Sequence, residues 1–342
     1  MPETGGRYSR QVLFSGIGPR GQERVQAASA VLVGCGALGS LQADLLVRAG
    51  LGRLRIIDRD FVERTNLQRQ VLFTEADADR ALPKAVAAAE HLRRVNSDVE
   101  VEGAVSDLTP GNAEALLEGF DLILDGTDNF EGRFLINDIA VKSGRPWVYG
   151  GCVGAYGVCL AIRPGHTACL SCLMPSPPTP GTSPTCDTVG VIGPAAGAVA
   201  CLQAAEALKI LSGHPERLRG ALVAMDLWRC TYQEVHVARD PACSTCGEGR
   251  FRYLEGGEGR SISVRLCGRN AVQITPPEPL QCDLDALARK LDPVGTVVAN
   301  AFLIRCQVGE HQLTIFRDGR LLVGGTDDPA VARGLYARYV GV

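Results

Sequence analysis

The sequence lacks the excess of basic residues that nucleic-acid binding requires. It has 35 Lys and Arg against 38 Asp and Glu, a net charge of −3. Because proteins that bind nucleic acids cluster Lys and Arg in excess, we predict no nucleic-acid partner. No uninterrupted apolar run reaches the ~18 residues of a membrane-spanning helix, so we predict no membrane association. The polar start of the chain lacks the apolar stretch of a signal peptide, which favours a cytoplasmic protein.

Strand-like and helix-like segments alternate along most of the chain. Strands are expected within 31–35, 51–58, 98–105 and 120–125, and helices within 37–50, 83–95, 130–144 and 194–213. This alternation predicts an α/β fold with a parallel, doubly wound, Rossmann-like sheet. Residues 1–250 are expected to form this main domain.

A second pattern begins after a Gly-rich linker. Strands are expected near 261–266, 271–275, 296–307 and 311–317, with helices near 283–292 and from Pro329 onward. We therefore predict that residues 256–342 form a small, separate α+β domain.

The 13 cysteines of the chain are unusual for a protein without an expected disulfide framework. Two Cys-x-x-Cys pairs, CLSC and CSTC, supply four thiolates that could form a closed tetrahedral zinc site; redox dithiols and a labile cluster are the alternatives. We expect packing in the core for Cys35, Cys152, Cys159 and Cys201. The predicted zinc ligands are Cys169, Cys172, Cys243 and Cys246.

A glycine-rich turn indicates a nucleotide site. Gly34, Gly36 and Gly39 form G-x-G-x-x-G between a predicted strand and helix, where phosphate oxygens can approach the backbone and the helix N-terminus favours negative charge. Asp58 ends the next strand, the usual place of a ribose-binding acid. An NAD-dependent oxidoreductase shares these features and is therefore one alternative.

The residues after Asp58 favour a triphosphate instead. Asp60, Asn66, Arg69 and Gln70 follow closely, and Arg69 could bind phosphate by charge-assisted hydrogen bonds, although a solvated polar loop would have the same composition. Lys84, expected in the first turn of a helix, would be disfavoured by the helix dipole unless a phosphate lay nearby. A surface lysine is the alternative.

Asp128 lies in GTDN, just after a predicted parallel strand. Ligands bind at the carboxyl ends of such strands, and a carboxylate there could hold Mg²⁺ together with substrate phosphates. The alternative is a helix N-cap, which Asp128 or Asn129 could provide.

Taken together, these motifs resemble the MoeB/ThiF family, prokaryotic relatives of ubiquitin-activating enzymes. The resemblance covers residues 7–250 and rests on RYSRQ, GCGALG, the D-x-D at 58–60, NLQRQ, Pro83-Lys84, GTDN and both CxxC pairs. It implies adenylation, with ATP and Mg²⁺, of the C-terminal glycine carboxylate of a ubiquitin-like sulfur-carrier protein ending in Gly-Gly. A cysteine desulfurase or another sulfur donor is a further expected partner.

The same resemblance implies roles for individual residues. Asp58 would bind ribose, Asn66, Arg69 and Lys84 the phosphates, and Asp128 the Mg²⁺. Arg10 would reach the triphosphate from the neighbouring subunit of a homodimer. Further residues expected to contact the nucleotide are Asp60, Gln70 and Asn129.

The Pro-, Ser- and Thr-rich stretch 174–190 is expected to be an exposed, mobile loop carrying Cys186. The resemblance implies that Cys186 can form a thioester or acyl-persulfide with the activated carrier; a spare thiol is the alternative. Cys267 lies in a segment without the pattern of a rhodanese loop, so persulfide transfer is not assigned there. A catalytically silent, carrier-binding scaffold is a third alternative, disfavoured because Arg10, Arg69, Lys84 and Asp128 are all present.

Overall fold

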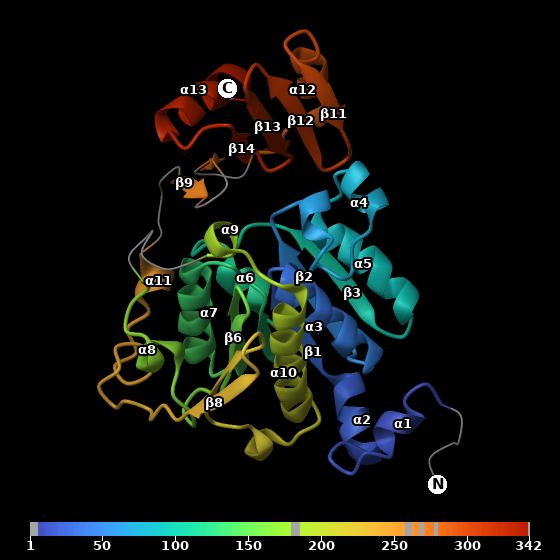
Figure 1. Cartoon of the computed structure of the whole chain (residues 1–342), viewed down its shortest axis with the longest axis vertical. Helices are drawn as coiled ribbons and strands as arrows, with labels where there is room; N and C mark the ends of the chain where they lie inside the picture. Colours follow the sequence, from blue (N-terminus) through green and yellow to red (C-terminus); the bar gives the residue numbers. More distant parts are fainter. Residues whose placement is uncertain (1–5, 179–184, 257–261, 267–269, 277–279, 341–342) are drawn as a thin grey trace. The chain divides into compact units, whose positions relative to one another are not determined.

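The computed structural model describes residues 6–178, 185–256, 262–266, 270–276 and 280–340. The chain divides into two units (Figure 1). One contains Met1–Thr182 with Gly190–Gly257, and the other contains Ser183–Val189 with Glu258–Val342.

An eight-stranded sheet forms the centre of the first unit, in the order β3-β2-β1-β4-β5-β6-β7-β8. The strands from β3 to β5 in this order are parallel, which confirms the predicted doubly wound sheet. The strands from β6 to β8 add an antiparallel extension that we did not predict. The strands are β1 (Ser29–Val33), β2 (Arg53–Asp58), β3 (Glu100–Val105), β4 (Leu122–Asp125), β5 (Trp147–Val153), β6 (Tyr156–Ile162), β7 (Leu222–Asp226) and β8 (Thr231–Val235).

Helices cover both faces of this sheet (Figure 1). Alternate side chains of β1 divide between two cores, because successive residues of a strand point to opposite faces. Ala30 and Leu32 pack with α3, α5 and α10, whereas Val31 and Val33 pack with α6 and α7. These helices are α3 (Ala37–Arg48), α5 (Lys84–Val95), α6 (Ala113–Leu117), α7 (Phe130–Ser143) and α10 (Gly193–Leu211).

Short helices complete the first unit. They are α1 (Ser9–Val12), α2 (Gly18–Ala27), η1 (Arg64–Asn66), α4 (Glu75–Asp79), α8 (Leu170–Leu173), η2 (Pro215–Arg217) and α11 (Arg252–Glu255).

Among the helices that the structure describes, α10 alone is long and apolar enough to cross a membrane by length and composition. It packs against α3, β5 and β6. Cys201 on α10 is exposed, so the expectation that it packs in the core was wrong; Cys35 and Cys159 are buried as expected. An apolar neighbourhood in the sequence did not reveal which side of the helix Cys201 occupies.

The second unit contains an antiparallel sheet in the order β11-β12-β13-β14-β10-β9. The predicted strand 296–307 is two strands, because Asn300 Oδ1 accepts hydrogen bonds from the N–H groups of Phe302 and Leu303 and turns the chain. The elements are α9 (Cys186–Val189), β9 (Ile262–Leu266), β10 (Ala271–Thr275), α12 (Leu284–Leu291), β11 (Thr296–Ala299), β12 (Leu303–Val308), β13 (His311–Phe316), β14 (Leu321–Gly324) and α13 (Pro329–Tyr339).

Candidate functional site

Several of the predicted nucleotide-binding residues follow strands that end at the same edge of the main sheet. Val33, the last residue of β1, pairs with Ile57 of β2 and with Asp125 of β4. The turns after these strands therefore begin at one level. We call this region the carboxyl-edge site; it comprises the turns that carry Gly34–Gly39, Asp58, Asp60 and Asp128, together with Lys84.

The glycine-rich turn of this site requires two of its glycines for close packing. Gly34 has φ +86°, and a Cβ there would lie 2.6 Å from the carbonyl oxygen of Gly126. Gly39 lies directly against the Gly34 carbonyl, so a side chain would not fit there either. A Cβ on Gly36 would meet nothing closer than 3.9 Å, to Gln70 Nε2 and Gly126 O. Gly36 is thus the position of this turn that leaves space for a ligand.

The carboxylate of Asp58 holds the glycine-rich turn in place by hydrogen bonds. Its Oδ2 accepts a hydrogen bond of 2.6 Å from Cys35 N, and its Oδ1 accepts one of 2.7 Å from Asp60 N. The side chain is buried, and burial raises the pKa of Asp58. Asp58 therefore shapes the glycine-rich turn, and a ribose would share a carboxylate that already holds the backbone.

Lys84 is buried at the N-terminus of α5, with 4% of its surface exposed. The surface-lysine alternative is therefore wrong. Its Nζ donates to Asp60 Oδ2 at 3.2 Å, and its N–H donates to the carbonyl of Asp60 at 2.9 Å. Asp60 thus offsets both the cost of burying a cation and the unfavourable helix dipole. Pro83 is the N-cap residue of this helix, one position earlier than expected.

In the segment after Asp60, some polar groups are held by hydrogen bonds within the protein, and others remain able to bind a ligand. Asn66 is buried, and its Oδ1 accepts a hydrogen bond of 3.1 Å from the N–H of Glu63, the N-cap residue of η1. Gln70 is buried near Gly36, and among the described residues its Oε1 has no hydrogen-bond partner. Arg69 is half-buried and donates from Nη1 to the carbonyl of Thr65 at 3.0 Å. The Gln70 amide and the Arg69 guanidinium therefore have capacity for a ligand, as does Asn66 Nδ2, which lies 3.5 Å from Thr65 Oγ1.

The loop after β4 separates Asp128 from the helix cap. Asn129 is the N-cap of α7 and accepts a hydrogen bond from Gly132 N at 2.7 Å. Asp128 is exposed, and within the described chain its carboxylate has neither a hydrogen bond nor an ion pair. The N-cap role thus belongs to Asn129, and Asp128 remains available for a cation.

We did not predict the charges that support these loops. Arg133 Nε lies 3.3 Å from Asp125 Oδ2 in a buried ion pair, and its Nη2 donates to the carbonyls of Thr127 and Gly150. Arg59 pairs with Asp107, which follows β3. The sequence contains no motif for either pair, because each joins segments that meet only in the folded sheet.

Arg10 lies at the opposite edge of the sheet. Gln11 Nε2 donates to the carbonyl of Ala49, and the ring of Tyr8 packs against Gly50, so α1 lies at the C-terminal end of α3. The 12 residues of α3 place that end about 18 Å from the glycine-rich turn. Arg10 is exposed and does not join the carboxyl-edge site of its own chain.

The four predicted zinc ligands form a cluster in the first unit, with all four Sγ atoms within 4.8 Å of one another. Cys169 Sγ lies 3.9 Å from Cys172 Sγ and 3.7 Å from Cys243 Sγ, and Cys172 Sγ lies 3.4 Å from Cys246 Sγ. Tetrahedral zinc with Zn–S bonds of about 2.3 Å separates its sulfurs by about 3.8 Å. The cluster therefore fits a tetrahedral metal ion, and all its thiols are free.

Helix α7 anchors this cluster, a support that the sequence did not reveal. Asn137 Oδ1 accepts a hydrogen bond from Leu170 N at 2.9 Å, and Asn137 Nδ2 donates to Ser171 Oγ. Ser171 Oγ and Thr245 Oγ1 lie 3.0 Å apart and link the two CxxC segments. Buried Asp138 accepts a hydrogen bond of 2.8 Å from Tyr253 N just beyond the cluster.

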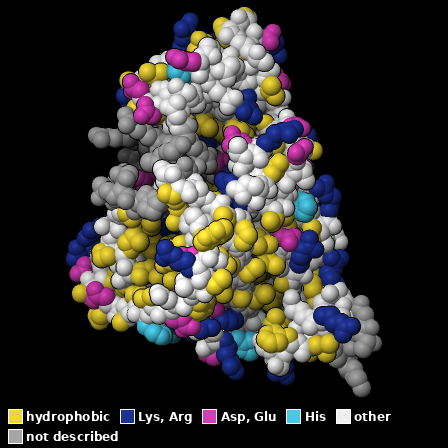
Figure 2. All heavy atoms as spheres, viewed as in Figure 1, with side chains coloured by type: hydrophobic (Ala, Val, Ile, Leu, Met, Phe, Trp, Pro, Cys, Tyr) yellow, Lys and Arg dark blue, Asp and Glu magenta, His cyan; other side chains and the backbone are white. Residues whose placement is uncertain are grey.

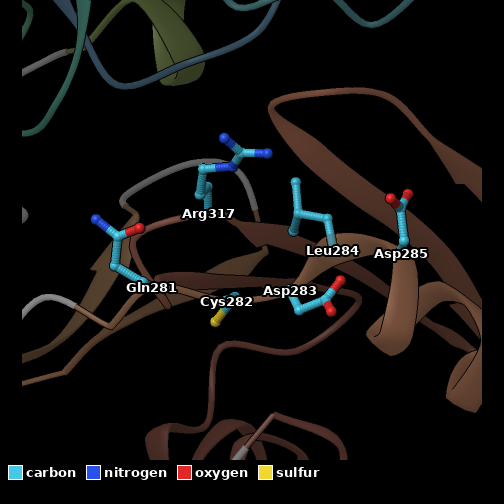
Figure 3. Close-up of a pocket in the computed structure, with 6 residues that line it drawn as sticks. All are labelled: Gln281, Cys282, Asp283, Leu284, Asp285 and Arg317. Carbon is cyan, nitrogen blue, oxygen red and sulfur yellow. The ribbon is translucent and has the colours of Figure 1, made fainter.

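Cys186 and Cys267 belong to the second unit. Cys186 is half-buried at the start of α9, so its thiol is less exposed than expected; residues 179–184 of the predicted mobile loop lie outside the described residues. Cys267 also lies outside them. This unit contains a cavity of about 340 Å³, where Arg317 extends opposite the start of α12 (Figure 3). It involves none of the predicted site residues.

Comparisons with known proteins agree with these features. The chain is 46% identical over 339 residues to the sulfur carrier protein ThiS adenylyltransferase of Bacillus subtilis (strain 168), covering 98% of this chain and 99% of that protein. It is 40% identical over 249 residues to the SAMP-activating enzyme E1 of Haloferax volcanii, covering 73% and 91%.

A solved structure of E. coli MccB with ATP has a TM-score of 0.62 and 25% identity, covering 71% of this chain and 75% of that one. The ThiF family model matches residues 8–245. The chain therefore belongs to the ThiF family.

Proposed function

We propose that this protein is an adenylyltransferase that uses ATP to activate the C-terminal glycine carboxylate of a ubiquitin-like sulfur carrier. The observation that carries the proposal is the buried Lys84 ammonium group at the N-terminus of α5, held by Asp60 at the carboxyl-edge site. A buried, oriented cation suits a triphosphate, whereas hydride transfer does not require one. The names of the relatives from B. subtilis and H. volcanii support the same activity.

The chemistry brings two anions together. The carrier carboxylate attacks the α-phosphorus of ATP, the bond to the β-phosphate oxygen breaks, and pyrophosphate leaves with the electron pair. Catalysis therefore consists of alignment and charge neutralisation, without a general base. In this proposal Lys84 and Arg69 neutralise the phosphates, Gly36 permits their approach to the helix N-terminus, and Asp58 receives the ribose.

Mg²⁺ is the proposed metal cofactor of the reaction. Asp128 would hold it, because its exposed carboxylate lacks a hydrogen bond or ion pair from the described residues. When bound, Mg²⁺ would neutralise phosphate charge. Zn²⁺ is the proposed ion of the four-cysteine cluster, where four thiolates leave no position for water and the role is structural.

We further propose that the active form is a homodimer. Arg10 lies too far from the glycine-rich turn of its own chain, so it could reach a triphosphate only in a second copy. Hydrophobic side chains gather over α10 and α3 on one face of the molecule (Figure 2). The partly buried residues Leu45, Leu202 and Leu208 belong to these two helices. A second copy would cover this apolar surface.

The carrier would end in Gly-Gly, and a cysteine desulfurase or another donor would supply the sulfur. Cys186 is the proposed site of a covalent link to the activated carrier. Free thiols at all the described cysteines suit a reducing compartment, so we propose a cytoplasmic location.

Carrier-dependent exchange of pyrophosphate into ATP tests the proposed function. The purified protein is incubated with ATP, Mg²⁺, labelled pyrophosphate and a small Gly-Gly-terminated carrier, and mass spectrometry detects the carrier–AMP adduct. We expect both signals, and neither with a carrier that lacks the two terminal glycines. Absence of exchange and of adduct with every Gly-Gly carrier tested would refute the proposal.

A further inference from the structure

Four alternating charges cross the carboxyl edge of the sheet, from the end of β3 to the start of α5. Arg59 Nη1 donates to Asp107 Oδ2 at 3.0 Å, and Arg59 Nε lies 3.9 Å from Asp60 Oδ1. The other oxygen of Asp60 accepts the hydrogen bond from Lys84 Nζ at 3.2 Å. We call Asp107, Arg59, Asp60 and Lys84 the charge chain. Asp60 stands between two cations and contacts each with a different oxygen.

The charge chain is partly shielded from water. The side chains of Arg59 and Asp107 are each 24% exposed, and that of Lys84 is 5% exposed. Burial lowers the pKa of Arg59, but Asp107, Asp60 and Asp128 outweigh this effect and raise the pKa above its ordinary range. Arg59 is therefore a fixed cation, and Asp107 anchors it to the segment that follows β3.

We propose that Arg59 and Asp107 are positioning residues that set, through Asp60, the place and availability of the Lys84 ammonium group for nucleotide phosphates. The inference rests on the proposed function, because it takes Lys84 as a phosphate-binding cation. Arg59 acts on Lys84 in two ways, and both favour the binding of phosphate. Arg59 orients the Asp60 carboxylate so that Oδ2 faces Lys84, and it shares the negative charge of Asp60, which leaves Lys84 less tightly held and able to contact a phosphate.

Nucleotide affinity tests this inference without requiring turnover. Calorimetry with Mg²⁺ and the non-hydrolysable analogue AMPCPP compares the wild-type protein with Arg59→Gln, Asp107→Asn and the double variant. We expect each single change to weaken binding roughly tenfold, a coupling typical of contacting residues. The double variant should bind within about twofold of the single ones, because both changes break one chain. Arg59→Lys should recover part of the affinity.

Arg64→Gln is the matched control. Arg64 lies on η1 of the same connection, is 62% exposed and pairs with Asp79 at 2.8 Å, outside the charge chain. It should bind AMPCPP like the wild type. Melting temperatures of Arg59→Gln and Arg64→Gln should agree with the wild type within about 2 °C, which separates positioning from loss of fold.

Three results would overturn the inference: wild-type affinity in Arg59→Gln, an equal loss in Arg64→Gln, or losses that multiply in the double variant. If Arg59→Gln does not fold, Asp107→Asn decides alone, and wild-type affinity in that variant overturns the inference. A protein that binds AMPCPP but shows no carrier-dependent exchange would refute the proposed function, while the affinities would still decide the role of the charge chain.

Discussion

The cysteine cluster and the carboxyl-edge site both join segments that are distant in the sequence, but different forces hold them. In the cluster, four cysteine side chains lie close together, and as thiolates they would repel one another unless a metal ion neutralised their charge. At the carboxyl edge, opposite charges and backbone hydrogen bonds hold each other, as Asp58 does with the glycine-rich turn and Asp60 with Lys84. Loss of one cluster ligand should therefore damage the fold, whereas loss of Arg69, which is half-buried and bonds one carbonyl, should damage chemistry first.

The largest effect that this difference predicts is on stability. Cys243→Ser removes a buried ligand, so the metal should be lost and the melting temperature should fall by about 10 °C or more, because the binding free energy of a structural metal contributes to folding. Elemental analysis measures the metal content, and calorimetry measures the melting temperature. Cys230→Ser, at an exposed thiol outside the cluster, is the control and should change neither. A fully metallated, equally stable Cys243→Ser protein would show that the cluster is not a clamp.

The carboxyl-edge site should respond in the opposite way. Arg69→Ala is expected to lower carrier-dependent pyrophosphate exchange by about 10²-fold or more, because a preorganised cation at the phosphates is lost. The melting temperature should change by less than about 2 °C, since the side chain is half-buried and bonds one carbonyl. Arg94→Ala, at an exposed position on α5, should retain full exchange. Undiminished exchange in Arg69→Ala would remove Arg69 from the site.

A smaller, pH-dependent effect is expected beside the cluster. Burial raises the pKa of Asp138 from 3.8 to about 6. Because the folded state prefers the protonated form, this group contributes stability below pH 4 that is lost as the pH rises through 6. Asp138→Asn should therefore stabilise the protein by about 1–2 kcal/mol at pH 7.5, and by nothing near pH 4. The amide oxygen can still accept the hydrogen bond from Tyr253 N.

Thermal unfolding at several pH values measures this effect. Asp98→Asn is the control, because Asp98 is exposed and pairs with exposed Arg7. Its melting temperature should follow that of the wild type at every pH. A constant difference between Asp138→Asn and the wild type across pH 4–8 would contradict the assigned titration.

The smallest effect concerns Cys186. Cys186→Ala should leave pyrophosphate exchange within about twofold of the wild type, because adenylation precedes any covalent link and needs charge neutralisation alone. If Cys186 forms that link, sulfur transfer to the carrier should fail in the same variant. Normal transfer in Cys186→Ala would favour the alternative of a spare thiol. A large loss of exchange would instead assign Cys186 a part in adenylation.

The sequence predicted the family, the parallel part of the main sheet and the adenylation activity, and the comparisons and the structure confirm these. It also predicted the set of four cysteines that cluster. These features are local: strands alternate with helices, and each CxxC pair brings two ligands together within one turn. The individual roles of Arg10, Arg69 and Asp128, the homodimer, Mg²⁺, zinc and the cytoplasmic location stay predictions.

What the sequence missed depends on distant partners. The hydrogen bond from Lys84 to the Asp60 carboxylate, and the one from Glu63 N to the Asn66 side chain, were not predicted; the nucleotide contacts expected of Asp60 and Asn66 stay predictions. The antiparallel strands β6 to β8 were missed because a turn at Gly154, with φ +61°, reverses the chain after β5. The two-residue connection between β5 and β6 is a local hairpin signal, because parallel strands need a much longer crossover, but our sequence analysis did not use it.

The sequence thus determined which chemical groups this protein has and which short motifs contain them. The spacing of hydrophobic residues, of glycines and of paired cysteines can be recognised within a few residues of the chain. Only the tertiary structure decided which charges face one another. The register of β1 with β2 and β4 brings the turns to one edge, and burial there makes Asp60 and Lys84 each other's partner. Charges in low dielectric must be compensated by their nearest neighbours in space, and that neighbourhood is set by packing.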